Sequence, residues 1–212
     1  MMSESDARTR ILECAEALFA ERGFRGARVD EIARRAGVNK ALIYYYFKSK
    51  QQLLDHLIER FLAESRPLKA DLLAQFAGRT GATPAASDDA LDSIIGFLAK
   101  RRSIIMIILN EGFHGESDAT ALLRYADNSF RDALAALPES ASVQSPPTAE
   151  TPAVSRLMFR SFFHLLLPLL GYTVLEDRWA RYHGTVSRET RSWLAEIMRE
   201  NLRAELAAVS GG

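Results

Sequence analysis

Side chains that can bind an anion are concentrated in one short stretch of the chain. Residues Gly37 to Lys50 read GVNKALIYYYFKSK, so three tyrosines and a phenylalanine follow one another between lysines. Lysine ammonium groups and tyrosine hydroxyls hydrogen-bond to phosphate oxygens, and aromatic rings contact sugars and thymine methyl groups. Aromatic residues at this density usually belong in a core. The stretch must therefore serve a core and a charged surface together.

The charge around this stretch is uneven. The whole chain has a net charge of zero, yet from Arg22 to Lys50 eight basic residues are opposed only by Asp30 and Glu31. That window carries +6, so the remainder carries −6. A basic end on an otherwise acidic body indicates an anionic partner such as nucleic acid.

Helical periodicity places the stretch in a helix-turn-helix. A first helix has apolar residues at helical spacing, and Gly23 is expected to end it as a left-handed cap; its inner face consists of Ile11, Cys14, Ala15, Leu18 and Phe19. A second helix ends at Gly37 in the same way, and its inner face consists of Val29, Ile32, Ala33 and Ala36. Asn39 can cap a third helix through its side-chain oxygen. Two short helices joined by a tight glycine turn are typical of this motif.

Winding the third helix at about 100° per residue divides its side chains between two halves. The outward half carries Lys40, Ala41, Tyr44 and Tyr45. The inward half carries Leu42, Ile43, Tyr46 and Phe47. The outward half has few groups that read bases, so sugar and phosphate contacts are favoured and part of the specificity is expected from DNA shape.

A fourth helix is predicted after Ser49, because Ser49 and Gln52 have the spacing of a capping box. Lys50 lies in its first turn, where free amides and the ammonium group both attract an anion. The helix is expected to end at Pro67. Its apolar stripe, which suits a connector between two domains, consists of Leu53, Leu54, Leu57, Ile58, Phe61 and Leu62.

The remaining chain is also read as helical, with no sustained strand alternation. Further helices are predicted at Leu68–Phe76, Ala90–Phe113 and Asp118–Leu137, and loops at Gly78–Asp89 and Pro138–Pro152. Two apolar helices follow, and the first is apolar over so much of its circumference that it must be covered from two directions. The predicted fold class is all-α, with one domain at 5–65 and a second helical domain at 66–212.

The two carboxy-terminal helices of two copies of the chain would form a four-helix interface. This predicts a homodimer whose contacts include Phe162, Leu166, Trp193, Leu194 and Ile197. The isoleucine-rich run from Ile104 to Leu109 is either plain core or the wall of a pocket for a small apolar or aromatic molecule. The pocket hypothesis assigns to the ligand Met106, Asn110, Glu111, His114, Phe159, Phe163 and His164.

Several function classes are disfavoured by what the sequence lacks. Glu111 and His114 could begin a metal site, but the four histidines form no second spaced pair, so no metal or cofactor is expected. No Gly-x-Ser-x-Gly elbow, phosphate-cradling glycine loop or Cys-x-x-Cys is present, which disfavours an enzyme. A single cysteine and no secretory signal favour the cytoplasm. The apolar stretch Ser161 to Leu175 is shorter than the roughly 20 residues of a membrane span and contains Pro168, so no membrane helix is expected.

Residues Arg10 to Leu54 resemble the DNA-binding domain of TetR-family transcriptional regulators. The resemblance rests on a combination of positions: Ala15, Leu18 and Phe19 before Gly23, the pair Ile32-Ala33, Ala36-Gly37-Val38, Tyr44 three before Phe47, and Lys50 followed by Leu53. It covers about the first 65 residues. The rest of the chain is similar to the family only in being all-helical.

The resemblance implies a dimer that binds double-stranded DNA at a near-palindromic operator. The third helix of each subunit would enter one of two successive major grooves. It also implies a ligand-responsive repressor that leaves the operator when a small molecule binds the second domain. The positions that would face DNA are Arg28, Asn39, Lys40, Ala41, Leu42, Tyr44, Tyr45 and Lys50. Arg28 departs from the family's usual threonine, so the second helix must be capped otherwise. A helical adaptor that docks a protein partner without binding an operator is the alternative.

Overall fold

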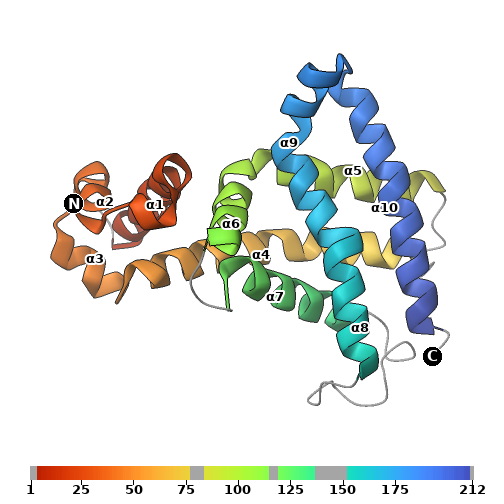
Figure 1. Cartoon of the computed structure of the whole chain (residues 1–212). Coiled ribbons are helices and arrows are strands. Elements are labelled where there is room, and N and C mark those ends of the chain that lie inside the picture. Colours follow the sequence, from red (N-terminus) through yellow and green to blue (C-terminus); the bar gives the residue numbers. More distant parts are fainter. Residues whose placement is uncertain (1–3, 77–83, 115–118, 137–151, 211–212) are drawn as a thin grey trace. The chain divides into compact units, whose positions relative to one another are not determined.

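The fold is all-α, as predicted. The computed structural model describes residues 4–76, 84–114, 119–136 and 152–210, and every regular element within these ranges is helical (Figure 1). The elements are α1 Glu4–Gly26, α2 Val29–Ala36, α3 Lys40–Tyr46, α4 Lys50–Phe76, α5 Pro84–Lys100, α6 Arg102–His114, α7 Ala121–Ala136, α8 Pro152–Arg160, the π-helix η1 Ser161–Leu166, α9 Leu167–His183 and α10 Ser187–Ser210.

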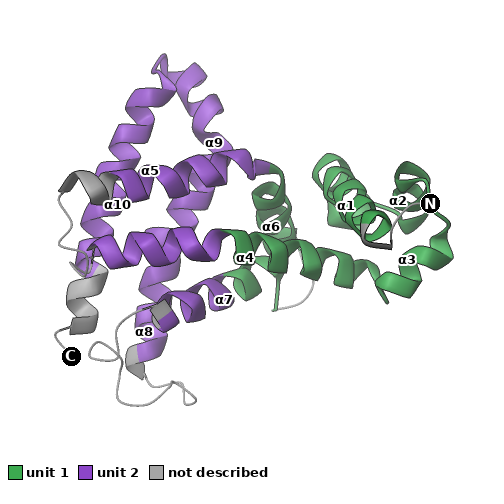
Figure 2. Cartoon of the chain, turned by 180° about the vertical axis from the view of Figure 1, so that it is seen from behind, with its two compact units in different colours: residues 1–64, 103–125 green, residues 65–102, 126–212 purple. Residues whose placement is uncertain are grey.

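The chain forms two compact units (Figure 2). Unit 1 comprises residues 1–64 and 103–125, and unit 2 comprises residues 65–102 and 126–212. Most of α6 and the start of α7 thus belong with the amino-terminal helices, a grouping that local sequence patterns do not reveal. The functional domain boundary after residue 65 stays a prediction.

Unit 1 is held by a core shared among its helices. The largest fully buried side chains include Leu18 and Phe19 of α1, Ile32 of α2, Ile43 of α3 and Leu54 of α4. At the edge of this core, the Glu16 carboxylate accepts hydrogen bonds from Arg60 of α4 at 2.8 Å and from Ser103 of α6 at 2.5 Å. One carboxylate of α1 therefore ties together two further helices of the unit.

Of the two left-handed glycine caps predicted in unit 1, the one at Gly37 is confirmed and the one at Gly23 is not. Gly37 has φ 64° and ψ 36°, the left-handed conformation, and its amide closes α2. Gly23 also has a positive φ of 72°, but its ψ of 161° lies outside the left-handed helical region. Only glycine adopts that conformation readily, so Gly23 kinks the chain at the end of the regular part of α1.

Three predicted element boundaries are wrong. α4 continues through Pro67 to Phe76, so the expected end at Pro67 and the separate helix Leu68–Phe76 are replaced by one helix. Proline removes one hydrogen bond to the carbonyl four residues earlier, and that residue, Ala63, is exposed, so water can take the bond. The predicted loop Gly78–Asp89 overlaps α5 from Pro84 onward. The predicted helix Ala90–Phe113 is divided at Arg101.

Two other predicted boundaries are nearly right where the structure describes them. α7 occupies most of Asp118–Leu137, although it begins only at Ala121. The predicted loop Pro138–Pro152 lies outside the described residues, apart from Pro152, which begins α8.

In unit 2 the chain is helical without interruption from Pro152 to His183, despite Pro168. The amide of Leu167 bonds to the carbonyl of Phe162, five residues back, as in a π-helix. Pro168 has no amide to give to the carbonyl of His164, and the side-chain amide of Asn201 in α10 donates to that carbonyl at 2.8 Å. The wider turn and this substitute donor let the helix pass through a proline.

This helix meets the length and composition of a membrane span. Val154–His183 contains an 18-residue window of mean hydropathy 1.4, and 11% of that window is buried. The sequence argument against a membrane span rested on the short length of Ser161–Leu175 and on Pro168, and the helix continues through that proline. Apolar helices at cores and subunit interfaces pass the same test. Gly184, with φ 67°, ends α9, and α10 returns beside it as a helical hairpin (Figure 1).

Candidate nucleic-acid interface and ligand cavity

The third helix has the two faces that the sequence predicts. Ile43 and Phe47 are fully buried, and Leu42 and Tyr46 are partly buried. On the opposite side Lys40, Ala41, Tyr44 and Tyr45 are exposed, with 45% of Tyr44 and 73% of Tyr45 accessible to solvent. The helix therefore anchors itself through one half and leaves a cation, a small residue and two phenol groups outside.

The turn before α3 is held by predicted contacts. The Asn39 side-chain oxygen accepts from the amide of Leu42 at 2.7 Å, which confirms the cap. After α3, the Ser49 hydroxyl accepts from the amide of Gln52 at 3.1 Å. The Gln52 side-chain oxygen accepts from the amide of Lys48 at 2.6 Å. In a standard capping box this bond would come from the amide of the next residue, Ser49. α3 is thus fixed at both ends.

Lys40, the cation of the outward half, has an acidic neighbour. Its Nζ lies 2.8 Å from Oδ1 of Asp30 in the first turn of α2, and both side chains are largely exposed. The hydrogen bond to Asp30 raises the pKa of Lys40. A phosphate that contacts Lys40 must therefore compete with a carboxylate, which sequence spacing alone did not indicate.

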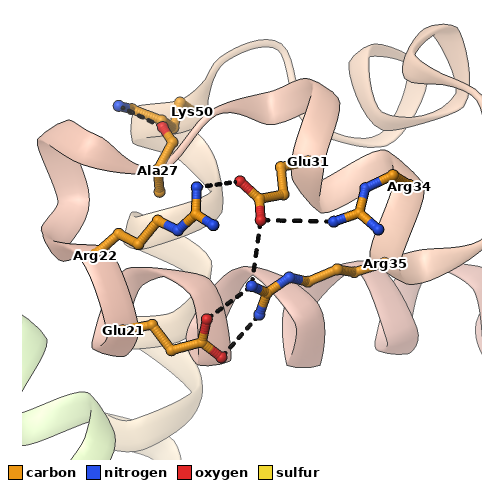
Figure 3. A network of polar contacts seen from close by, with 7 residues as sticks. All are labelled: Glu21, Arg22, Ala27, Glu31, Arg34, Arg35 and Lys50. Carbon is orange, nitrogen blue, oxygen red and sulfur yellow. Dashed lines mark hydrogen bonds and ion pairs between the residues drawn. The ribbon is translucent and has the colours of Figure 1, made fainter.

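Much of the remaining basic charge is neutralised within the unit (Figure 3). The Glu31 carboxylate lies 2.6 Å from Arg22, 3.2 Å from Arg35 and 3.7 Å from Arg34. Arg35 also donates two bonds to Glu21, at 2.8 and 2.7 Å. That pairing lowers the pKa of Glu21 and raises the pKa of Arg35. Glu21 lies just outside the basic window, so the +6 overstates the charge that is open to a partner.

Lys50 is bound within unit 1. Its ammonium donates to the main-chain carbonyls of Phe24, Ala27 and Arg25, at 2.8, 3.2 and 3.4 Å, and lies 4.5 Å from the centre of the Phe24 ring. Burial lowers the pKa of this group. Lys50 joins the start of α4 to the segment that links α1 and α2, and its phosphate contact stays a prediction.

Two other cations remain open on this surface. Arg28 precedes α2 and its side chain makes no cap, so the other cap that the sequence analysis required for this helix does not come from this residue. The side chains of Arg28 and Lys48 are exposed, and neither makes a hydrogen bond or ion pair within the part of the chain that the structure describes. Lys48 was not among the predicted contacts, although its place between the third and fourth helices was a signal for it.

Unit 2 contains a partly open cavity of about 200 Å³. It is lined by residues of α4, α5, α7, α8, η1, α9 and α10, and all but two of them are apolar. The exceptions are Ser129 and Ser161. Such a cavity suits an apolar molecule with few polar groups.

None of the seven residues predicted to bind a ligand lines this cavity. On α6, Met106 is exposed, the Glu111 carboxylate accepts from the amide of Ala121 at the start of α7, and His114 bonds to the carbonyl of Asn110. Their neighbours Ile104, Ile105, Ile107 and Ile108 are buried, as in the core interpretation of that run. In unit 2, Phe159, Phe163 and His164 are exposed. Their role as ligand contacts stays a prediction without support from the cavity.

The predicted dimer residues fall into two groups. Phe162 and Leu166 line the cavity and Leu194 is buried, whereas Trp193 and Ile197 are about half exposed. All the exposed large apolar side chains that the structure describes in unit 2 lie on or between the last helices: Phe159, Phe163, Leu175, Trp179, Tyr182, Val186, Trp193 and Ile197. The sequence analysis assigned both Trp193 and Leu194 to the dimer contacts, but α10 places them in different environments.

Among the described residues, no three histidine, cysteine, aspartate or glutamate side chains gather as metal ligands. Cys14, expected in the core, is partly buried, and burial raises the pKa of its thiol.

Helices α1 to α3 and the exposed half of α3 define a helix-turn-helix protein, joined to an all-helical unit with a cavity. Residues 11–57 match the family profile described as bacterial regulatory proteins, tetR family. Residues 11–57 of the chain therefore resemble the helix-turn-helix domain of that family, and the match covers less than a quarter of the chain.

Curated relatives match mainly in the same region. The HTH-type transcriptional repressor KstR2 of Rhodococcus jostii is 41% identical over 59 residues, 28% of this chain and 29% of that protein. The HTH-type transcriptional repressor NicS of Pseudomonas putida is 28% identical over 111 residues, 50% of this chain and 49% of that protein. The chain therefore spans half or less of the length of these relatives.

Solved structures share the fold along the whole chain. A protein from Mesorhizobium loti described as a TetR-family regulator has a TM-score of 0.60 at 16% identity, with 98% of each chain covered. A TetR-like transcriptional regulator from Rhodococcus sp. RHA1 has a TM-score of 0.54 at 18% identity, with 98% of this chain and 99% of that chain covered. At this identity the likeness is one of fold.

Proposed function

We propose that the chain is a DNA-binding transcriptional regulator that acts as a homodimeric, ligand-responsive repressor in the bacterial cytoplasm. The observation that carries the proposal is the outward half of α3: Lys40, Ala41, Tyr44 and Tyr45 are exposed on a short helix capped by Asn39. A helix presented in this way can enter a major groove, with its phenol and ammonium groups on sugars and phosphates.

The open cations add to this surface. Arg28 and Lys48 are exposed beside α2 and α3 and are the natural phosphate contacts, together with Lys40 once it leaves Asp30. The names of relatives such as KstR2 and NicS, which describe repressors, support the direction of regulation.

The second unit supplies the proposed effector site and dimer interface. An apolar effector would occupy the cavity and reduce the affinity for a near-palindromic operator. A second copy would cover the exposed aromatic and aliphatic side chains of α8 to α10, because an apolar surface of that extent rarely stays in water.

A mobility-shift assay on DNA flanking the chain's own gene tests DNA binding. We expect binding to fall steeply with salt and to be lost in the double variant Lys40→Ala plus Tyr44→Ala. Lys100→Ala, which removes an exposed cation at the end of α5, is the control and should bind like the parent. Binding that is insensitive to salt and to the double variant would favour a helical adaptor that docks a protein partner.

A further inference from the structure

The wall of the cavity in unit 2 contains one polar side chain that contacts a charged residue outside the lining. Of its two lining serines, Ser129 is buried, and its hydroxyl oxygen accepts a hydrogen bond from Nζ of Lys69 at 3.2 Å. No such bond reaches Ser161 among the contacts that the structure describes. The two serines are thus chemically distinct positions in one apolar wall.

The charges behind Ser129 do not balance. Nζ of Lys69 lies 3.6 Å from one oxygen of Asp132, and Nε of Arg66 lies 3.1 Å from the other. Two cations therefore share one carboxylate. Lys69 and Asp132 are each only 17% exposed, so solvent screens these two charges weakly, whereas Arg66 is 60% exposed and its charge is screened more strongly. Burial lowers the pKa of Lys69, and Asp132 opposes that shift.

The bond to Lys69 also sets what Ser129 can recognise. A serine hydroxyl that accepts from an ammonium group keeps its own proton to donate. The hydrogen bond from the Lys69 ammonium polarises the Ser129 hydroxyl, which makes the hydroxyl a stronger hydrogen-bond donor. Ser129 is therefore arranged to meet an acceptor, and an anionic acceptor would also offset the excess positive charge.

We propose that the cavity binds a hydrophobic molecule with a single carboxylate, with its apolar body among the leucines and phenylalanines and its carboxylate at Ser129 beside Lys69. This inference rests on the proposed effector-responsive regulator and names the chemical class of its effector. A cavity of about 200 Å³ suits a molecule of roughly eight to ten non-hydrogen atoms, because a cavity of about 150 Å³ takes up benzene.

Three eight-carbon probes test the head group on the full chain: octanoate, 1-octanol and octylamine. Their affinities, measured by calorimetry, should fall in that order, with octanoate about ten-fold tighter than 1-octanol because hydrogen bonds to charged groups are the stronger ones. Octylamine should bind most weakly, because its cation would meet the excess positive charge of Lys69 and Arg66.

Variants then locate the head group. Ser129→Ala should weaken octanoate about ten-fold, whereas the matched control Ser161→Ala should keep the preference for octanoate over 1-octanol. Lys69→Met should remove that preference while 1-octanol still binds, and Lys69→Arg should retain it. Melting temperatures without ligand check that each variant folds. If Lys69→Met does not fold, the charge-conserving Lys69→Arg still tests the role of the cation.

The proposal is overturned if 1-octanol or octylamine binds the parent as tightly as octanoate, if Ser129→Ala leaves octanoate binding unchanged, or if no probe binds at millimolar concentration. The mobility-shift assay without ligand separates this failure from failure of the proposed function. Operator binding without octanoate binding rejects only the carboxylate site. Octanoate binding without DNA binding keeps the site and rejects the regulator.

Discussion

At the residue scale, Asp30 and Lys40 form an exposed ion pair on the proposed DNA-facing surface, 2.8 Å apart. The Asp30 carboxylate pairs with the Lys40 ammonium and repels the phosphate groups that would otherwise bind to it. We expect Asp30→Asn to tighten DNA binding about two- to five-fold at low salt, a small effect because exposed pairs are weak. The salt dependence of binding should steepen by about one unit of slope, because one more cation displaces counterions.

Fluorescence anisotropy of labelled DNA across a salt series measures both effects. The control is Asp92→Asn, an exposed carboxylate on α5 in unit 2, which should change neither. Weaker DNA binding by Asp30→Asn would mean that Asp30 positions Lys40 for its contact rather than competing with the phosphate.

Lys50 offers a test between a structural and a phosphate-binding role. Its three bonds to carbonyls predict that Lys50→Met lowers the free energy of unfolding by about 1–2 kcal/mol, because the carbonyls lose a charged donor. Urea unfolding measures this, with exposed Lys48→Met as a control that should have almost no effect. An unchanged stability together with lost DNA binding would instead assign Lys50 to phosphate.

Local pattern predicted the exposed and buried halves of α3, because both follow from about 100° of rotation per residue. It also predicted the Asn39 cap, which joins residues three apart. It did not predict the bonds of Lys50, whose partners lie 23 to 26 residues earlier. Nor did it predict the pairing of Arg35 with Glu21, which depends on how α2 packs against α1.

At the scale of elements, Gly37 sets the turn of the helix-turn-helix. Its φ is 64°, and a β-carbon there would touch nothing within 4 Å. We expect Gly37→Ala to destabilise the chain by roughly 1 kcal/mol through backbone strain alone. Gly96 is a matched control inside α5, also with nothing within 4 Å but without a positive φ.

Gly96→Ala should stabilise the chain, by up to about 1 kcal/mol, because alanine favours a helix more than glycine does. Thermal melts followed by circular dichroism compare the two variants. Equal effects of the two changes would contradict the conformation assigned to Gly37.

Asn201 supports the helix across Pro168. We expect Asn201→Ala to destabilise the chain by about 1 kcal/mol, because the carbonyl of His164 loses its donor and gains only water. The control is Asn128→Ala, an exposed asparagine on α7. Chemical denaturation distinguishes them, and identical midpoints would show that Asn201 adds nothing.

The prolines explain where element prediction failed. Pro67 was expected to end the fourth helix, and Pro168 was counted against a membrane span, yet both lie within continuous helical runs. At Pro168 the carbonyl of His164 accepts from the side chain of Asn201, whereas Ala63, four residues before Pro67, is exposed, so its carbonyl can bond to water. Such partners become visible only when the helices are assembled.

At the scale of the whole molecule, the proposed dimer depends on the exposed apolar residues of the last helices. Replacing Trp193 and Ile197 together by glutamate should place two charges in the interface and yield a monomer. Light scattering at micromolar concentration measures the mass. The control is Phe113→Glu, an exposed aromatic residue of unit 1. A parent chain that is itself monomeric would remove the dimer proposal.

Composition and periodicity predicted an all-helical molecule but not its cavity. The lining is drawn from five separate stretches of sequence between Leu72 and Leu202, and apart from Ser129 and Ser161 each position in it has the pattern of ordinary core. Phe162 and Leu166, which the pattern assigned to the dimer, line the cavity instead. Which apolar residues enclose a space depends on three-dimensional packing.

The π-helical segment makes the second unit sensitive to chain length as well as to side-chain identity. An inserted or deleted residue in a helix rotates everything beyond it by about 100°. The extra residue accommodated within Ser161–Leu166 therefore sets the angular phase of all of α9. Shortening this segment by one residue would carry Leu169 away from the cavity and bring other side chains toward it, although the amino-acid composition would scarcely change.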